Sequence, residues 1–263
     1  MRGKLGFAQT LMFGRTGRAL IHPFTARQYE PGARAKAPLS TELKEVIPWW
    51  IAQLARTRPR MVSTRARSPV LVYTDACGEG HIGAAIVIDG TRYYHLTHVP
   101  AWFLRAKVGI FELELAACVF GLVLASLYAP GRPVLLCCDN MGSRGAVVRG
   151  SCATVIGRMV ASVFWNVAAH FPCAVRVDYV PSGLNVADPP SRACECLPVE
   201  ERAKDVSAGA PSLFRHLLSS RHALAASQFQ LDISAIAIQN GRSCTALNTP
   251  KSINLSSVFC FGG

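Results

Sequence analysis

Short β-branched runs and longer apolar segments alternate between residues 68 and 193, and their order restricts the fold more than any other feature of the chain. The β-branched runs predict strands at 69–74, 81–88, 92–99, 133–138 and 174–180, and the longer segments predict helices at 110–128, 142–148 and 154–170. Asp89-Gly90 is a hairpin turn signal between the second and third strands. A meander followed by strands that return through helices predicts an α/β fold with a five-stranded mixed β-sheet, three strands antiparallel and then parallel crossovers, flanked by helices.

The longest apolar run covers residues 115–129 and is bounded by polar or helix-breaking residues. It is shorter than the ~20 residues that a membrane-spanning helix needs. Glu112 and Glu114 precede it, and Pro130-Gly131 follows it. We therefore expect a core helix, no contact with a membrane and a soluble intracellular protein, with the nucleus and the cytoplasm both open as its location.

The two ends of the chain differ from this middle part. Residues 1–66 are rich in Arg and Pro and are expected to form a basic connection-like segment, with residues 67–195 as the main domain and residues 196–263 as a weakly structured tail. Within the first segment, Ser40 or Thr41 can cap a helix, and Trp49 and Trp50 should pack against a neighbour. Residues 56–67 read as a linker, and residues 213–226 could form a helix.

The positive charge is concentrated before Ser68. Residues 1–67 hold thirteen Lys or Arg and three Glu, which accounts for most of the net charge of +12. Such a segment favours a polyanionic partner such as nucleic acid, although a solvated basic face explains the charge equally well.

The cysteines do not have the spacing of a zinc site. The sequence holds ten cysteines and no C-x-x-C pair, and neither Cys137-Cys138 nor Cys194-x-Cys196 has a zinc-ligand spacing. Free thiols, buried in a reducing compartment, are the better interpretation.

Four acidic residues stand where predicted strands and helices meet. Asp75 ends the first strand, Asp139 ends the fourth, Asp188 follows the fifth by a short loop, and Glu114 lies in the apolar helix. If the first and fourth strands are neighbours, Asp75 and Asp139 lie side by side. A carboxylate on a buried helix face is costly unless it is paired or binds a metal, and a cluster of carboxylates implies a bound cation.

Oxygen ligands without nearby His or Cys favour two Mg²⁺ ions, with Mn²⁺ as the alternative. Two such ions clamp both sides of an in-line phosphoryl displacement. Taken singly, each acid also has an ordinary structural interpretation: a turn or cap for Asp75, a helix cap for Asp139, a turn before Pro189-Pro190 for Asp188, and a solvent-reaching helix edge for Glu114.

The motifs around these acids resemble those of ribonuclease H domains. T-D-A-C-G-E-G-H-I-G-A-A at 74–85 is similar to the family's first strand and hairpin, and I-F-E-L-E-L-A-A at 110–117 to the helix with its glutamate. Family helices follow that glutamate with Leu, any residue, then Ala, which selects Glu114 over Glu112. C-D-N at 138–140 with V-V-R-G-S at 147–151 resembles the third motif of retroelement forms.

The closing motif V-P-S-G-L-N-V-A-D-P-P-S-R at 180–192 resembles the one in reverse transcriptases of DIRS-type (tyrosine-recombinase) retroelements, in which an Asn precedes the last Asp by three. R-G-K-L-G-F-A-Q-T-L-M-F-G-R-T-G-R at 2–18 is similar to their segment between polymerase and nuclease. The resemblance implies a ribonuclease H-like fold that hydrolyses the RNA strand of RNA–DNA hybrids with two metal ions, held by Asp75, Glu114, Asp139 and Asp188. It also implies nucleic-acid contacts through the backbone of Ala76, Cys77 and Gly78 and at Asn140, Arg149 and Asn185, although Asn140 and Arg149 could equally be plain surface residues.

Two departures from the family pattern leave alternatives open. The loop Ser182-Gly183-Leu184 lacks the His that cellular members often carry, and no polymerase motif is visible, so we expect the polymerase domain of the parent element to be missing from this chain. An inactive nucleic-acid-binding remnant of a retroelement is one alternative function. A DNA-cutting relative of the same superfamily is another, although Asp188 in a Pro-rich loop fits it poorly.

Overall fold

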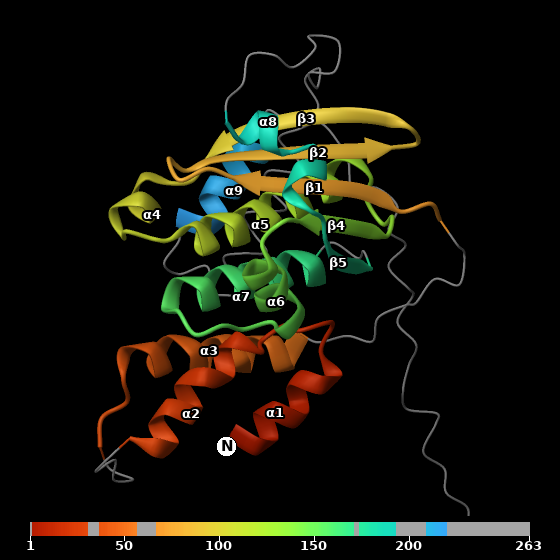
Figure 1. Cartoon of the computed structure of the whole chain (residues 1–263). Helices are drawn as coiled ribbons and strands as arrows, with labels where there is room; N and C mark the ends of the chain where they lie inside the picture. Colours follow the sequence, from red (N-terminus) through yellow and green to blue (C-terminus); the bar gives the residue numbers. More distant parts are fainter. Residues whose placement is uncertain (1, 31–36, 57–66, 171–173, 193–208, 220–263) are drawn as a thin grey trace, which may run out of the picture.

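A computed structural model describes residues 2–30, 37–56, 67–170, 174–192 and 209–219, and its centre is a mixed β-sheet (Figure 1). The strands are β1 (Val70–Ala76), β2 (His81–Ile88), β3 (Thr91–His98), β4 (Val134–Cys138) and β5 (Val175–Tyr179). They form one five-stranded sheet in the order β3-β2-β1-β4-β5. Strand β2 pairs antiparallel with both β1 and β3, β4 pairs parallel with β1, and β5 pairs parallel with β4. The predicted fold class, an α/β fold with a five-stranded mixed β-sheet flanked by helices, is confirmed.

The register brings the ends of β1 and β4 to the same edge of the sheet. Thr74 pairs with Cys138 across the parallel ladder, so the residues that follow them, Asp75 and Asp139, lie at the same level of the sheet. On the antiparallel side, Asp75 pairs with Gly83 of β2. The expectation that the first and fourth strands are central neighbours is therefore correct.

Helix α5 (Ile110–Tyr128) is the centre of the hydrophobic core. It packs on β1 and β2, and α7 (Val155–His170) and α9 (Gly209–Ser219) pack on it in turn. By length and composition α5 could cross a membrane, but nearly all of its residues are buried within the protein. It is thus the core helix that the polar boundaries of the apolar run predicted.

Helix α9 differs from the sequence-based expectation. A helix was expected at 213–226, whereas α9 covers Gly209–Ser219, and residues 220–226 lie outside the described residues. Its buried residues Leu213, Phe214 and Leu217 join the main core, and Phe214 stacks near Phe120 of α5. The boundary expected at residue 195 stays a prediction, but a helix beyond that boundary completes the core.

Shorter elements connect the main ones. They are α4 (Ala101–Arg105) between β3 and α5, α6 (Met141–Arg149) between β4 and α7, and η2 (Ser182–Leu184) and α8 (Asp188–Ser191) after β5. Helices α6 and α7 run 141–149 and 155–170, close to the ranges expected from the sequence.

The N-terminal residues form a helical unit with its own small core. Its elements are α1 (Arg2–Leu11), η1 (Ala19–Ile21), α2 (His22–Tyr29) and α3 (Thr41–Arg56). As predicted, a helix begins at Thr41, and Trp49 and Trp50 are buried, although they pack on Leu5, Met12 and other residues of this unit. The sequence did not predict α1 and α2, because α1 contains glycines, α2 contains Pro23, and both residue types disfavour helices in isolation.

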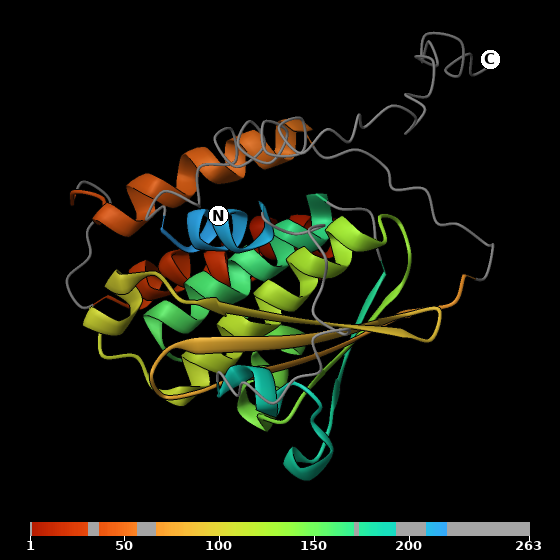
Figure 2. The same cartoon turned by 90° about the horizontal axis from the view of Figure 1, so that it is seen from above.

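The N-terminal unit lies beside α6 and α7 (Figures 1 and 2). The Phe13 ring meets Trp165 of α7 edge-on at a centroid distance of 6.3 Å. The Thr16 hydroxyl donates to the Trp165 carbonyl at 3.3 Å, and Arg15 Nε donates to the Val148 carbonyl at 3.2 Å. The unit is therefore docked on the face of the core that lies away from the sheet.

Candidate metal centre

Asp75 sits near the end of β1 with its side chain buried, 6% exposed. The Ser191 hydroxyl of α8 donates a hydrogen bond to its Oδ2. Burial raises the pKa of Asp75 above its ordinary value, and the charges of Asp139 and Asp188 raise it further, whereas the Ser191 hydroxyl opposes the shift. This carboxylate is therefore held in an environment that disfavours its charge when no cation is present.

Glu114 lies buried on α5 beside Asp75. Its side chain is 4% exposed, and Oε2 has no hydrogen-bond partner among the described residues. Burial, followed by the charges of Asp75 and Asp139, raises the pKa of Glu114 to about 9. A buried carboxylate oxygen without a donor costs free energy unless a cation or proton satisfies it.

The neighbouring Glu112 has a different task in the same helix. Its Oε2 accepts a hydrogen bond from the backbone N–H of Gly109 at 3.1 Å, so that it caps the start of α5. This geometry is consistent with the selection of Glu114 over Glu112 as the metal ligand, because Glu112 Oε2 accepts a hydrogen bond from the helix start and Glu114 Oε2 has no partner among the described residues.

Asp139 completes a cluster of three carboxylates. It follows β4 directly and is half-buried. One carboxylate oxygen from each of Asp75, Glu114 and Asp139 lies within 4.8 Å of the other two. The structure thus brings together three of the four acids that were expected to share a site.

Asp188 is close enough for its charge to act on Asp75, but it is not among the three residues whose carboxylate oxygens lie within 4.8 Å of one another. It begins α8 and its Oδ1 accepts hydrogen bonds from Arg192 Nε at 2.9 Å and pairs with Arg192 Nη2 at 2.8 Å. Its charge is nevertheless one of the causes that raise the pKa of Asp75. In this arrangement Arg192 offsets the charge of the fourth acid, a partner that sequence reasoning missed although it ends the quoted motif.

Gly83 in β2 lets α8 approach the sheet closely enough for the Ser191 hydroxyl to reach Asp75. A Cβ on Gly83 would lie 2.4 Å from the Ser191 backbone nitrogen and 2.6 Å from the Ala187 carbonyl oxygen. Any larger residue would force α8 away from the strand, since backbone atoms cannot swing aside. Sequence reasoning quoted this glycine and this serine within longer motifs but assigned a role to neither.

Two side chains that were expected to contact nucleic acid, Asn185 and Asn140, form hydrogen bonds within the protein. Asn185 is 4% exposed, and its Nδ2 donates to the Thr74 carbonyl at 3.0 Å. Asn140 caps α6 by accepting a hydrogen bond from the Ser143 backbone N–H at 3.0 Å. Both side chains therefore position elements of the site, and neither enters our proposal as a direct contact to nucleic acid.

The other expected contacts lie at two separate places. Ala76 is buried, Cys77 is half-buried and Gly78 is exposed in the turn that follows Asp75. The Cys77 backbone N–H donates to the His81 carbonyl at 3.0 Å, so this group is already paired. Arg149 is exposed at the far end of α6, which begins beside the cluster.

The cluster suits a hard divalent cation. Its ligands are carboxylate oxygens only, which favours Mg²⁺ or Mn²⁺ over zinc. The partnerless Glu114 Oε2 and the raised pKa of Glu114 and Asp75 both indicate that negative charge here lacks a counter-charge from the described part of the protein. A bound cation would supply it.

Comparisons with known proteins yield weak similarities of fold to solved structures and no match by sequence. No protein-family model and no curated protein matches the sequence. Among solved structures, the chain is similar to the N-terminal RNase H domain of rv2228c from Mycobacterium tuberculosis, which was determined as a fusion with maltose binding protein. The similarity covers 49% of this chain and 96% of that chain, with 13% sequence identity and a TM-score of 0.40. A likeness at this level transfers no residue role, so the site has to be assigned from the geometry of this chain.

Proposed function

We propose that this chain is a nuclease that hydrolyses the RNA strand of RNA–DNA hybrids with two divalent ions, Mg²⁺ or Mn²⁺. The observation that carries the proposal is the cluster of Asp75, Glu114 and Asp139 within 4.8 Å, which contains the partnerless oxygen of Glu114. Asp188 completes the proposed ligand set, since its charge already acts on Asp75. When bound, the metal ions activate a water molecule for attack on the phosphodiester and stabilise the leaving 3′-oxygen.

The residues around the cluster act by orienting its ligands. Ser191 holds the Asp75 carboxylate in place through its hydroxyl, and Arg192 holds Asp188. Asn185 fixes the loop that carries Asp188 against β1. Such supporting hydrogen bonds keep metal ligands in position, and their loss typically lowers metal affinity or activity by about 10- to 100-fold.

The choice of hybrid as substrate and the retroelement origin rest on the resemblance of the sequence motifs. In our proposal, the exposed turn at Gly78 meets the 2′-hydroxyl groups that distinguish RNA from DNA. The parent protein is then a reverse transcriptase of a DIRS-type retroelement, in which this unit follows a polymerase domain.

Cleavage of a labelled RNA–DNA hybrid, with duplex RNA and duplex DNA of the same sequence beside it, tests the proposal. We expect Mg²⁺- or Mn²⁺-dependent cleavage of the RNA strand of the hybrid alone. Asp139→Asn should abolish it with the fold retained, because the substitution preserves shape and removes a charged ligand. Asp178→Asn is the matched control: Asp178 lies on β5, where Arg176 and Arg144 pair with it, and it is not in the cluster.

The other outcomes separate the alternatives. Cleavage of duplex DNA in place of the hybrid would identify a DNA-cutting relative. Binding of the hybrid without cleavage at any divalent ion would identify an inactive remnant, and retained cleavage in Asp139→Asn would refute the assignment of the metal ligands.

A further inference from the structure

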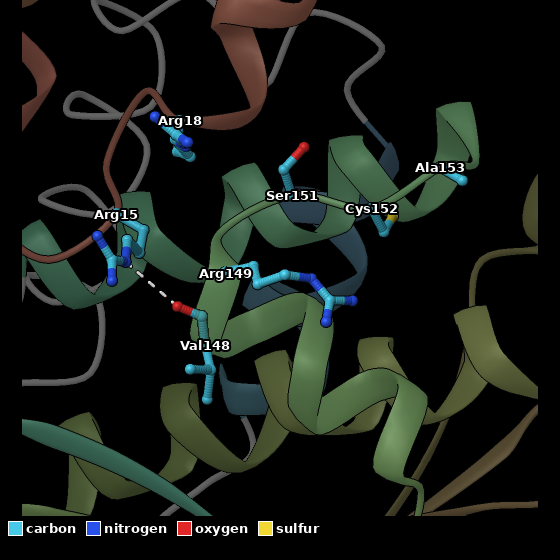
Figure 3. A pocket seen from close by; sticks show the side chains of 7 residues that line it. All are labelled: Arg15, Arg18, Val148, Arg149, Ser151, Cys152 and Ala153. Atoms are coloured by element: carbon cyan, nitrogen blue, oxygen red, sulfur yellow. Dashed lines mark hydrogen bonds between the residues drawn. The ribbon is translucent and has the colours of Figure 1, made fainter. Parts of the chain in front are cut away.

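Two adjoining hollows, of about 550 and 590 Å³, lie where the N-terminal unit meets the end of α6. The first is lined by Arg15 and Arg18 from the N-terminal unit and by Arg149 and Ser151 from the core (Figure 3). Arg18 and Ser151 also line the second, to which Arg2 and His22 contribute. The hollows share residues and form one basic cleft, which we call the seam cleft.

The charge in the seam cleft is not balanced by nearby carboxylates. In the described ranges of the chain no acidic residue pairs with Arg15, Arg18 or Arg149, although other arginines, such as Arg132 and Arg192, do pair with aspartates. No acidic residue lines either hollow. Several guanidinium groups around one open cleft attract a phosphate-bearing ligand, because Arg presents a planar fork of donors that matches phosphate oxygens.

The cleft is built by a close approach of the two parts of the chain. Gly150, which ends α6 with φ +70°, leaves room for Arg15: a Cβ there would lie 2.3 Å from the Arg15 Cβ. Arg15 Nε is held by the Val148 carbonyl at 3.2 Å, as Figure 3 shows. Arg15 is therefore held by the core, and Arg15, Arg18 and Arg149 are all exposed.

Helix α6 connects the seam cleft to the carboxylate cluster. The helix begins two residues after Asp139 and ends at Arg149, and its nine residues span about 13 Å. Successive nucleotides of one strand rise by about 3.4 Å along a duplex, so this length corresponds to about four nucleotides. A hybrid cut at the cluster has backbone phosphates at that separation.

We propose that the seam cleft, defined by Arg15, Arg18, Arg149 and Ser151, binds the phosphodiester backbone of the nucleic acid about four nucleotides from the carboxylate cluster. The proposal rests on the proposed function for the identity of the ligand, and it gives the N-terminal unit a part in substrate binding. The contacts are to phosphate, so they add affinity without reading sequence.

Binding of a labelled RNA–DNA hybrid in EDTA, measured by fluorescence anisotropy across a salt series, tests the cleft without cleavage. Arg18→Gln and Arg149→Gln should each weaken binding about three- to ten-fold and lower the slope of log affinity against log salt by about one. Arg18→Lys should keep the slope, because it keeps the charge. Arg92→Gln is the matched control, since Arg92 is exposed near the start of β3, at the opposite end of that strand from the level of Asp75.

A shorter hybrid adds a test of position. When the duplex extends fewer than about four base pairs from the cluster, Arg18→Gln and the unmodified protein should bind it equally. Equal salt slopes for Arg18→Gln, Arg149→Gln and the unmodified protein on the long hybrid would overturn the proposal. Cleavage is measured separately in Mg²⁺. If the variants lower the salt slope but the protein does not cleave the hybrid, the cleft binds nucleic acid and the proposed nuclease function is wrong. If the protein cleaves the hybrid and the slopes are unchanged, only the proposed role of the cleft is wrong.

Discussion

Asn185 donates a hydrogen bond from Nδ2 to the backbone carbonyl of Thr74 at 3.0 Å and so ties the loop before Asp188 to the residue before Asp75. Its Oδ1 accepts a second hydrogen bond from the Ala187 backbone N–H at 3.2 Å. Because Asn185 is 4% exposed, water cannot replace these bonds. One amide group therefore sets the spacing between two of the proposed metal ligands.

Replacing this amide should impair both stability and cleavage. Asn185→Leu keeps the size but leaves the Thr74 carbonyl and the Ala187 N–H without partners, at a cost of about 1–3 kcal/mol for each buried group. We expect a lower midpoint in urea unfolding and cleavage reduced more than ten-fold at saturating Mg²⁺. Full cleavage by a destabilised Asn185→Leu protein would mean that the amide supports the fold but not the site.

The close contact between Gly83 and α8 leads to a second prediction. Gly83→Ala should push α8 off β2, because the new Cβ would lie 2.4 Å from the Ser191 nitrogen. Asp75 then loses the Ser191 hydroxyl, and we expect a lower apparent affinity for Mg²⁺ in a cleavage titration. Gly183→Ala is the control, since a Cβ at Gly183 meets nothing within 4 Å. The same Mg²⁺ dependence in both variants would contradict the role of this contact.

The raised pKa of Glu114 predicts how the metal-free protein responds to pH. Since its pKa is about 9 in the folded state against an ordinary value of 4.5, the folded state binds more protons than the unfolded state between these values. The favourable contribution of protonated Glu114 is complete below pH 4.5 and is lost as the pH rises toward 9. We expect the unfolding free energy in EDTA to decline over this range and Mg²⁺ to restore it.

Two variants isolate the contribution of Glu114 from that of other groups. Glu114→Gln should remove most of this decline and raise the stability of the metal-free protein at neutral pH, because the amide has no charge to bury. Glu112→Gln should leave the decline in place, since Glu112 caps the start of α5. Urea unfolding at several pH values measures both, and parallel pH curves for the unmodified protein and Glu114→Gln would count against the assignment.

The contact between Phe13 and Trp165 predicts that the N-terminal unit stabilises the core. Phe13→Ala removes a half-buried ring that meets Trp165 edge-on and should cost about 1–2 kcal/mol, below the range for a fully buried ring. Phe7→Ala is the control, because Phe7 is 69% exposed. Chemical denaturation compares the two, and equal midpoints would show that the unit is attached without being coupled to the core.

Much of the site could be foreseen because its acids occupy positions that local patterns define. Asp75 and Asp139 directly follow runs of β-branched and apolar residues, and strand ends are readable from a sequence. Glu114 stood out as a charge on an apolar helix face, and the structure shows it buried. Asp188 was also foreseen near the cluster, but its pairing with Arg192 was not, since a hydrogen bond between two polar residues leaves no mark in the hydrophobic pattern.

What the sequence by itself determined is the order of strands and helices, the mixed sheet and the acids at its edge, because these follow from the period of apolar residues along short segments. Only the tertiary structure decided which polar side chains support the cluster, where α1 and α2 form, and that Arg15, Arg18 and Arg149 line the same cleft. The supporting hydrogen bonds and the cleft join residues more than a hundred positions apart, as Thr16 joins Trp165. Their free energy comes from burial and contacts that exist only once the chain has folded, so no local pattern encodes them.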